Sequence, residues 1–597
     1  MQRLELIDSE EATDWYSEKH QGLCAIRDHL ELKTNWHPIE AEASLGNNFA
    51  TISPNMGFTL LMTKFRTPLL VLGFIAMGLL GFWLAKTAAP GPSAENLPRE
   101  EIAPQRKSPA AEDEMPRFRK ATREPVYKSD QEAADAGALL GQRVLVFKDN
   151  DALEAFLKRA GNKVLLLGRL DALNALRIGF LNMDLLAGLL DGQEEISLIF
   201  PVDVPTNSEG IAQDGAIPLG AKLLEWLGIT GDNSSWGAGI KIAILDTGVL
   251  QHSGTTGKIS WINLLGDSAP PTTNGHGTAV ASMINGNNPL APGIAPSSQI
   301  VSVRIADNEG GSNSFLLAAG IVAAVDAGAS IINISMGSFG DSAVVRNAIE
   351  YAREAGSVII AAAGNNGTNR VTYPGANQGV TTIGSVDGAN DLMAFSNRGT
   401  QIAFAAPGYN VNAAWPGDQY VSVSGTSFST PIFSGTVAGV MTAMGVTATQ
   451  AIQLIGKYSN DVGSAGNDLG SGAGVPNIGR ILNSKTRGIY DAAVASQQLI
   501  PPGASTPNGQ IEVLVQNRGT ENLVNARVDI STPSGIVTRN ITSLMPQGVH
   551  SFSIPINVAP RQDGSALRYD SQVTLTQGKQ DSNPTNDRRS NLYTPAP

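Results

Sequence analysis

Short apolar runs alternate with helical patterns between residues 240 and 460. The runs have the length of single strands, and they are almost wholly apolar instead of alternating with polar side chains. Strands of that composition are buried on both faces, which is typical of parallel sheets whose connecting helices cover both sides. The pattern predicts an α/β fold around a parallel sheet, and its clearest strands are IKIAILD, IVSVR, SIINIS and SVIIAAAG.

A different pattern precedes this region, and another follows it. Residues 141–204 alternate strand-like and helical segments, such as RVLVF and DALEAFLKRA, and predict a small α+β domain. After a break rich in Pro and Gly at residues 501–509, the segments IEVLVQ, ARVDI, HSFSIPI and SQVTLT alternate with period two. That alternation predicts a β-sandwich, which we place at residues 505–597.

The N-terminal part contains one long apolar run, LLVLGFIAMGLLGFWLA at residues 69–85. It carries no charge and reaches the lower limit of length for a transmembrane helix. Lys64 and Arg66 precede the run and favour a cytoplasmic N-terminus with an exported remainder. We expect residues 62–86 to be a signal anchor or a cleaved signal peptide. The folded domains would then lie outside the cytoplasm, in the periplasm or at the cell surface, either membrane-anchored or secreted.

Two further segments flank this run. Residues 1–61 show no recognisable site, and an ordinary export signal could begin at Met62. We interpret residues 1–61 as an extension of uncertain role that a wrongly assigned start site would explain. Residues 87–140 are rich in Pro, Ala and Glu, a composition that cannot bury a core and therefore predicts a linker.

Composition excludes several classes of function. The 597 residues carry a formal net charge of −12 and contain no long basic run, so we expect no nucleic-acid partner. Cys24 is the only cysteine, which excludes an intramolecular disulfide and a zinc site built from four thiolates.

Four polar residues stand where a strand ends or a helix begins. Asp246 ends the strand IKIAILD, at the edge of a parallel sheet where ligand crevices form. His276 lies between two glycines, and Asn365 lies in the loop AGNNG that follows a strand. Ser427 begins an apolar helix with Pro431 in its opening turns. Each feature by itself is more typical of a helix cap or a turn than of a catalytic group.

Together, the segments ILDTG, NGHGTA, AGNNG and SGTSFSTP resemble, in this order, the motifs of subtilisin-like serine peptidases. The resemblance covers residues 216–486 and implies a serine endopeptidase that hydrolyses peptide bonds through an acyl-enzyme intermediate. Ser427 would be the nucleophile, His276 its general base, and Asp246 the carboxylate that orients the imidazole. The amide of Asn365 and the backbone N–H of Ser427 would form the oxyanion hole.

The resemblance also implies where a protein or peptide substrate would bind. An extended substrate would pair with a strand edge, a form of β-augmentation, and lie between two walls of backbone. The residues implied for these walls are Ser335, Met336 and Gly337 on one side and Ala362, Ala363 and Gly364 on the other.

The primary side-chain pocket would have Asn366 and Thr372 near its base. Because no carboxylate is expected there, we predict a preference for apolar or medium-sized side chains over Lys or Arg. Phe428 and Ser429 replace the Met and Ala that are common beside the nucleophile in this family. We expect neither residue to touch a catalytic group.

The flanking domains fit the same family. Residues 141–204 resemble the inhibitory propeptide that blocks the cleft of these enzymes until it is removed, which implies an autoprocessed zymogen. We expect cleavage between Asp203 and Leu219. The C-terminal stretch resembles the bacterial cell-adhesion-related (CARDB-like) sandwich domains of the immunoglobulin type, which would act as a spacer, a stabiliser or a binding domain.

The sequence gives little indication of a bound metal or cofactor. The resemblance implies that catalysis needs no cofactor and no metal. Structural calcium is frequent in the family, and here the segment INGNNPLAPG offers Asn285, Asn287 and Asn288 but no carboxylate. A calcium site made only of amides would be weak.

Two alternatives stay open at this point. An acid serine-carboxyl peptidase has a similar nucleophile segment, but it has a Glu in place of the histidine and an Asp as the oxyanion donor. An inactive, protease-like adhesion scaffold is the alternative outside the enzymes.

Overall fold

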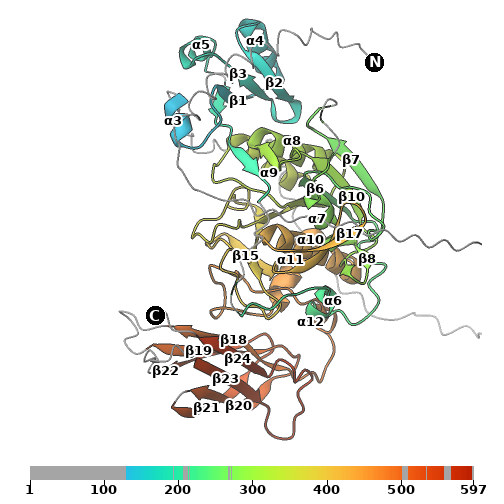
Figure 1. Ribbon diagram of the computed structural model, residues 1–597, viewed down its shortest axis with the longest axis vertical. Coiled ribbons are helices and arrows are strands. Elements are labelled where there is room, and N and C mark those ends of the chain that lie inside the picture. The colour runs from blue at the N-terminus through green and yellow to red at the C-terminus, as the bar shows by residue number, and fades with distance from the viewer. Residues whose placement is uncertain are drawn as a thin grey trace, which may run out of the picture. The chain divides into compact units, whose positions relative to one another are not determined.

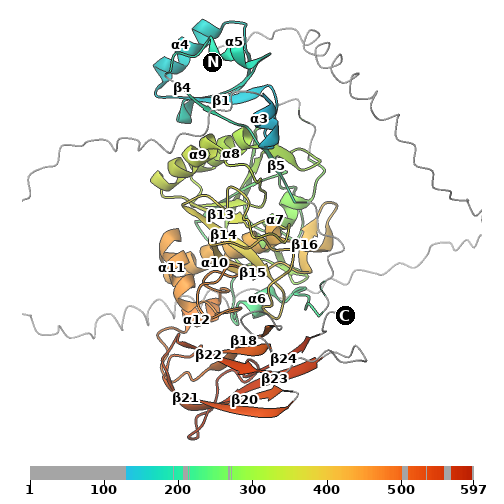
Figure 2. The ribbon, with the colours of Figure 1, turned by 90° about the vertical axis from the view of Figure 1, so that its left-hand side faces the viewer.

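The computed structural model describes residues 130–192, 194–205, 213, 215–266, 269, 272–500, 509–532, 534–556 and 567–593. The chain divides into two compact units, Met1–Met115 and Pro116–Pro597, and every described residue belongs to the second. The extension predicted at residues 1–61 and the apolar segment 69–85 therefore lie outside the described residues. Figures 1 and 2 trace the second unit from the N-terminal blue to the C-terminal red.

The described residues begin inside the segment that the sequence predicts to be a linker. Residues Asp130–Asp135 form helix α3. Ala133 and Ala138 are buried in a cluster with Leu198 and Phe200. Residues 130–140, which the sequence predicts to belong to the linker, therefore include small side chains that pack into the fold.

The small domain has the predicted mixture of strands and helices. Its four-stranded sheet has the order β2-β3-β1-β4, and its neighbouring strands are antiparallel. Helix α4 begins after Asp149, whose carboxylate accepts the backbone N–H of Ala152 and caps the helix. The elements are β1 Gln142–Phe147, α4 Asn150–Ala160, β2 Leu165–Leu170, the 3-10 turn η2 Asp171–Leu173, β3 Ala175–Gly179, α5 Met183–Ala187 and β4 Glu194–Ser197.

A seven-stranded parallel sheet forms the central domain and confirms the predicted architecture. Its order is β15-β14-β13-β12-β6-β10-β7. Four strands match the predicted apolar runs: β6 Lys241–Asp246, β10 Gln299–Arg304, β12 Ile331–Ile334 and β13 Val358–Ala362. The other three are β7 Ile259–Asn263, β14 Val380–Val386 and β15 Ile402–Pro407.

Helices cover both faces of this sheet (Figures 1 and 2). Strand β6 shows why its run is continuously apolar, since alternate side chains enter opposite cores. Ile242 and Ile244 belong to one hydrophobic cluster, and Ala243 and Leu245 belong to another. The helices are α6 Leu223–Trp226, α7 His276–Asn285, α8 Ser314–Asp326, α9 Ala343–Glu354, α10 Thr426–Met444, α11 Ala448–Tyr458 and α12 Ile478–Leu482.

Helix α10 is the central helix of the first cluster, and every residue from Thr426 to Met441 is buried. In the part of the chain that the structure describes, no single helix is long and apolar enough to cross a membrane. Helices α10 and α11 meet that criterion only as a pair bent by 101°.

Short strands pair outside the main sheet. The strand β5 (Pro201–Asp203), which follows the small domain, pairs with β11 (Gly311–Asn313) of the central domain. Two hairpins complete the central domain: β8 Asn287–Asn288 with β9 Ala291–Pro292, and β16 Val411–Trp415 with β17 Gln419–Val423.

The C-terminal domain consists of two antiparallel sheets that share one hydrophobic cluster. Its first strand begins at Ala492, earlier than the boundary predicted at residue 505, because the break rich in Pro and Gly joins two strands of this domain. One sheet is β18 Ala492–Ile500, β19 Gln510–Asn517 and β22 Val549–Pro555. The other is β20 Leu523–Thr532, β21 Gly535–Leu544, β23 Leu567–Thr574 and β24 Arg588–Tyr593.

Candidate active site

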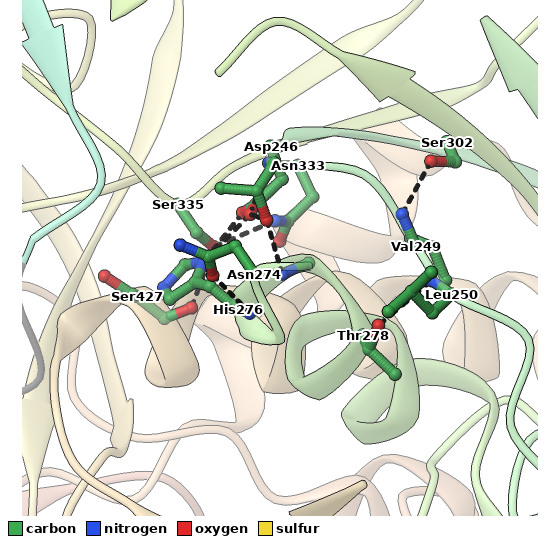
Figure 3. A network of polar contacts seen from close by, with 12 residues as sticks. Asp246, Val249, Leu250, Asn274, His276, Thr278, Ser302, Asn333, Ser335 and Ser427 are labelled. Atoms are coloured by element: carbon green, nitrogen blue, oxygen red, sulfur yellow. Dashed lines mark hydrogen bonds and ion pairs between the residues drawn. The ribbon is translucent and has the colours of Figure 1, made fainter. Parts of the chain in front are cut away.

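Asp246 and His276 form a buried hydrogen-bonded pair. Asp246 ends β6 and is fully buried, while His276 is the first residue of α7 (Figure 3). Both carboxylate oxygens of Asp246 lie 2.9 Å from Nδ1 of His276. An ionised carboxylate can only accept, so Nδ1 carries the hydrogen and Nε2 presents a lone pair. The backbone N–H of Thr247 donates to the same carboxylate at 2.8 Å and holds it in place.

The position of His276 is set by its neighbours along the chain. Asn274 accepts the backbone N–H of His276 through Oδ1 at 2.9 Å, which satisfies one of the free N–H groups at the start of α7. Gly277 approaches the backbone of Gly248 so closely that a Cβ there would lie 2.4 Å from the Gly248 carbonyl oxygen. The glycine after His276 therefore lets α7 approach the end of β6.

Ser427 lies in the first turn of α10, as the sequence predicts. Gly425 precedes the helix with φ of 142°, a conformation open to glycine and not to residues with a side chain. The Oγ of Ser427 and the Nε2 of His276 are both buried, and neither has a hydrogen-bond partner in the structure. These are the two atoms between which a nucleophile and its base exchange a proton.

Phe428 corrects one expectation from the sequence. Its ring centroid lies 5.2 Å from that of His276, so the residue after Ser427 does touch the imidazole. Helix geometry explains the contact, because α10 and α7 pack against each other where the two side chains emerge. Phe428 thus forms part of the apolar wall beside the imidazole.

Asn365 is oriented by the helix that carries Ser427. Its Oδ1 accepts the backbone N–H of Thr426 at 2.9 Å and the Thr426 hydroxyl at 2.8 Å. With the oxygen engaged, Nδ2 is the group that this side chain can offer as a donor to a bound substrate. Together with the backbone N–H of Ser427 at the helix N-terminus, it can stabilise an oxyanion, as the sequence predicts.

The substrate edge predicted from the sequence is occupied by the chain itself. The backbone N–H of Asp203 donates to the Gly337 carbonyl, and the N–H of Gly337 donates to the Asp203 carbonyl, each at 3.2 Å. On its other side, β5 pairs with β11, and the N–H of Val204 donates to the Gly310 carbonyl at 2.9 Å. An extended segment is therefore held between two backbone edges, which is β-augmentation within one chain.

The second edge, β11, is absent from the sequence prediction. Its sequence, Gly311–Asn313, has no apolar alternation that would identify a strand. Only the pairing with β5 shows that it is one.

A cavity of about 600 Å³ adjoins this segment. Of the predicted binding residues, it is lined by Met336, Gly337, Ala362 and Gly364, together with Asn366 and Thr372. The other two predicted residues do not line it. The hydroxyl of Ser335 is buried and donates to the backbone carbonyl of Ser427, and the carbonyl of Ala363 accepts the N–H of Thr372.

Arg370 is a lining residue that the sequence did not point to. Its guanidinium donates to the Phe339 carbonyl at 2.5 Å and lies 5.0 Å from the centroid of the Phe339 ring. The lining of the cavity therefore includes a cation, Arg370, and one carboxylate, Asp203, which belongs to the inserted segment.

The ionised form of one carboxyl group in the inserted segment, that of Asp203, is disfavoured. Partial burial, and then repulsion from Asp307, raises the pKa of Asp203 above its ordinary value. Asp307 sits at the turn that leads into β11, where its carboxylate accepts the N–H of Gly311. Backbone hydrogen bonds thus hold the segment in place, although the carboxylates of Asp203 and Asp307 repel each other.

The residues suggested for calcium do not fit a calcium ion. The Asn285 amide donates to the Thr256 carbonyl, and the Oδ1 of Asn288 accepts the backbone N–H of Leu290. No carboxylate occurs in the segment 284–293 to balance a dication. Across the described residues, no three His, Cys, Asp or Glu side chains gather into a metal site.

Comparisons with known proteins cover the region of this site. A family model described as the subtilase family matches residues 237–474, a span that contains Asp246, His276, Asn365 and Ser427. Thermitase from Thermoactinomyces vulgaris is 35% identical over 236 residues, covering 38% of this chain and 84% of that protein. Subtilisin Savinase from Lederbergia lenta is 33% identical over 204 residues, covering 34% of this chain and 76% of that protein.

Two further proteins are similar to this chain, but different shares of each chain align. The thermostable alkaline protease of Halalkalibacterium halodurans is 36% identical over 234 residues, which cover 38% of this chain and 64% of that protein. The chain thus spans less than two thirds of that relative. A crystal structure of the epidermin leader peptide processing serine protease of Staphylococcus aureus aligns with a TM-score of 0.49 and 21% identity, covering 58% of this chain and 98% of that one.

The oxyanion role of Asn365 leads to a kinetic prediction. Asn365→Ala removes Nδ2, and we expect kcat to fall by about 10²- to 10³-fold, a magnitude measured on a subtilisin for the loss of such a donor. KM should change little, because the donor acts on charge that develops in the transition state. Steady-state kinetics on a chromogenic peptide measures both values. Asn369→Ala, an exposed residue of the same loop that does not line the cavity, is the control, and an equal loss in both variants would contradict the assignment.

Proposed function

The chain belongs to the subtilase family, whose members are serine-type endopeptidases, and from this premise we propose that Ser427, His276 and Asp246 are its catalytic triad. The observation that carries the proposal is the buried Asp246–His276 pair, together with the Ser427 hydroxyl and the His276 Nε2, which are both buried and lack a hydrogen-bond partner. The chain is a serine-type endopeptidase, so the finer question is which groups carry out each step.

In the proposed mechanism, Nε2 of His276 takes the proton of Ser427 as Oγ attacks the substrate carbonyl carbon. The oxygen becomes negative and accepts hydrogen bonds from Asn365 Nδ2 and the Ser427 N–H. Asp246 keeps the imidazole in the required tautomer and stabilises its protonated form without taking up the proton. His276 then protonates the leaving amine, and water, activated in the same way, releases the acyl group from Ser427.

The alternative of an acid serine-carboxyl peptidase has little support. That family places a Glu where His276 stands and uses an Asp as the oxyanion donor. Here the imidazole pairs with a carboxylate, and an amide is fixed beside the helix N-terminus. An inactive scaffold would need none of these contacts.

We also propose that residues 141–204 are an inhibitory propeptide and that the chain matures by cutting itself. The insertion of β5 between Gly337 and β11 supports this, because the segment occupies the edges that an extended substrate would use. Downstream, the N–H of Ile217 donates to the Asp387 carboxylate at 2.7 Å, so the chain is held again on another loop. The cut should fall between Val204 and Ile217, within the range expected from the sequence.

The remaining parts of the proposal rest on the sequence. The apolar run 69–85 supports export, with the peptidase domain outside the cytoplasm and either anchored in the membrane or secreted after cleavage. The C-terminal sandwich, with its CARDB-like sequence of the immunoglobulin type, would stabilise the peptidase domain or bind a surface. Arg589 of this domain pairs with Asp391 of the central domain at 2.5 Å, which favours a stabilising role.

Self-cleavage is tested with Ser427→Ala. We expect intact-mass analysis over several hours at pH 7.5 to show loss of the residues before the cut, between Val204 and Ile217, in wild type alone. The variant lacks the nucleophile and should keep its full mass. Identical cleavage of both chains would mean that another protease cuts them. An uncut wild type would contradict self-processing.

Because the carboxylates of Asp203 and Asp307 repel each other, we predict that the Asp203→Asn segment binds the peptidase domain more tightly than the wild-type segment. Exposed carboxylate pairs are worth up to about 1 kcal/mol, so the inhibition constant should fall by about fivefold at most. Activity recovered on dilution of the cleaved but unseparated protein measures this constant. Asp184→Asn, on α5 of the small domain, is the matched control.

The same contact predicts a pH dependence. Because the pKa of Asp203 is raised in the cleft relative to the free segment, the bound state takes up a proton more readily. Binding should be tightest below the ordinary aspartate pKa of about 3.9, weaken as pH rises through the raised pKa, and stay constant above it. Asp203→Asn should lose this dependence. Co-elution of the cut segment with the enzyme between pH 4 and 7 gives the comparison.

Arg370, the cation at the cavity wall, leads to a prediction about which substrate side chains the enzyme prefers. A Leu-type chromogenic peptide should show a kcat/KM at least about tenfold higher than a Lys-type peptide, because Arg370 repels a second cation. Arg370→Gln should raise turnover of the Lys-type peptide and leave the Leu-type peptide nearly unchanged. Comparable turnover of both peptides by wild type would contradict the prediction.

A further inference from the structure

The helix that carries Ser427 contains a proline one turn further on. In a regular helix, the carbonyl of residue 427 accepts the N–H of residue 431. Pro431 lies inside α10 and has no N–H, so the carbonyl of the nucleophile loses its regular helical donor. Ser427 is buried, and a buried carbonyl without a donor is costly.

Ser335 supplies the missing donor from another element. Its hydroxyl lies 2.8 Å from the Ser427 carbonyl oxygen and donates to it (Figure 3). Ser335 follows β12 directly, two residues before Gly337, whose backbone pairs with the segment in the cleft. One short stretch of chain therefore contacts both the backbone of the nucleophile and the extended peptide.

The Ser335 hydroxyl is itself held in one orientation. Nδ2 of Asn333 donates to the Ser335 Oγ at 3.0 Å, and Oδ1 of Asn333 accepts the Ser434 hydroxyl at 2.9 Å. Ser434 lies on α10, so the contacts run from α10 to β12 and back to α10. All three side chains are fully buried. Because Ser335 Oγ accepts from Asn333, its own hydrogen is free to point to Ser427.

We propose that Ser335 is a positioning residue, which replaces the helical donor lost at Pro431 and fixes the peptide unit of Ser427 relative to the strand edge that holds the substrate. Asn333 and Ser434 act through Ser335 by setting the direction of its hydroxyl. The Ser427 N–H, the oxyanion donor, lies in the same first turn of α10 as the carbonyl that Ser335 holds. This inference rests on the proposed use of Ser427 as the nucleophile.

The test compares Ser335→Ala with wild type in the full-length chain. Ser335→Ala keeps the backbone that pairs with substrate, so KM should change by less than about twofold. The reacting atoms lose their alignment, so kcat should fall by about 10- to 100-fold. The pH at which kcat/KM is half-maximal should not move, because the Asp246–His276 pair is untouched. Asn333→Ala should give a smaller loss of the same kind.

A second substitution separates positioning from the mere satisfaction of a buried carbonyl. Pro431→Ala restores a backbone N–H at residue 431, and this N–H can donate to the Ser427 carbonyl. We expect Ser335→Ala/Pro431→Ala to regain thermal stability relative to Ser335→Ala. Its kcat should stay about tenfold or more below that of Pro431→Ala alone. If kcat returns to the value of Pro431→Ala, Ser335 serves stability alone and the proposal is wrong.

Two controls complete the experiment. Ser459→Ala removes another buried hydroxyl of the same domain, which donates to the Ile455 carbonyl at 2.8 Å. It should lower the melting temperature without lowering kcat. Ser427→Ala tests the premise, and an active Ser427→Ala chain would refute the proposed function itself. An active wild type with an equally active Ser335→Ala variant would refute only the positioning role.

Discussion

The burial of helix α10 is the constraint on which the site depends. Its residues from Thr426 to Met441 are enclosed, and small side chains allow neighbouring elements to come close. A Cβ at Gly439 would lie 2.8 Å from the Trp236 ring, and one at Gly435 would lie 3.2 Å from Ile294. A helix packed so closely cannot slide or rotate without creating voids or clashes. The position of Ser427 at its first turn is fixed for the same reason.

Three side chains of the site contact this helix. Asn365 is oriented by Thr426, the imidazole of His276 packs beside Phe428, and Ser335 holds the Ser427 carbonyl. Only Asp246 is fixed from elsewhere, by the end of β6 and the N–H of Thr247. The proposed nucleophile, base and oxyanion donors therefore all contact one rigid helix, which is the preorganisation that this chemistry needs.

The cleft recognises backbone more than side chains. The segment 201–204 is held through hydrogen bonds to Gly337, Gly310 and β11, and any extended peptide could make the same bonds. The proposed inhibitory segment and a substrate can thus use one site without sharing a sequence. The Asp203–Asp307 repulsion weakens the bound segment, which is compatible with an inhibitor that must later leave.

The sequence by itself determined the parallel sheet, its four apolar strands and the four residues of the proposed catalytic constellation. Each of these is a local feature: a continuous apolar run, a strand end, or a glycine-flanked polar residue at a helix start. β7 could not be predicted, because three of the five residues of ISWIN are exposed and its pattern is not that of a buried strand. The short strand β11 had no pattern at all.

Only the tertiary structure decided which elements meet. It showed the pairing of β5 with β11 and Gly337, the Phe428 ring against His276, Arg370 at the cavity wall, and the bond from Ser335 to the carbonyl that Pro431 leaves without a donor. These contacts join residues far apart along the chain, and they depend on how helices and strands pack. Local patterns reflect the periodicity of burial within one element, whereas the identity of the neighbour is set by the packing of the whole domain.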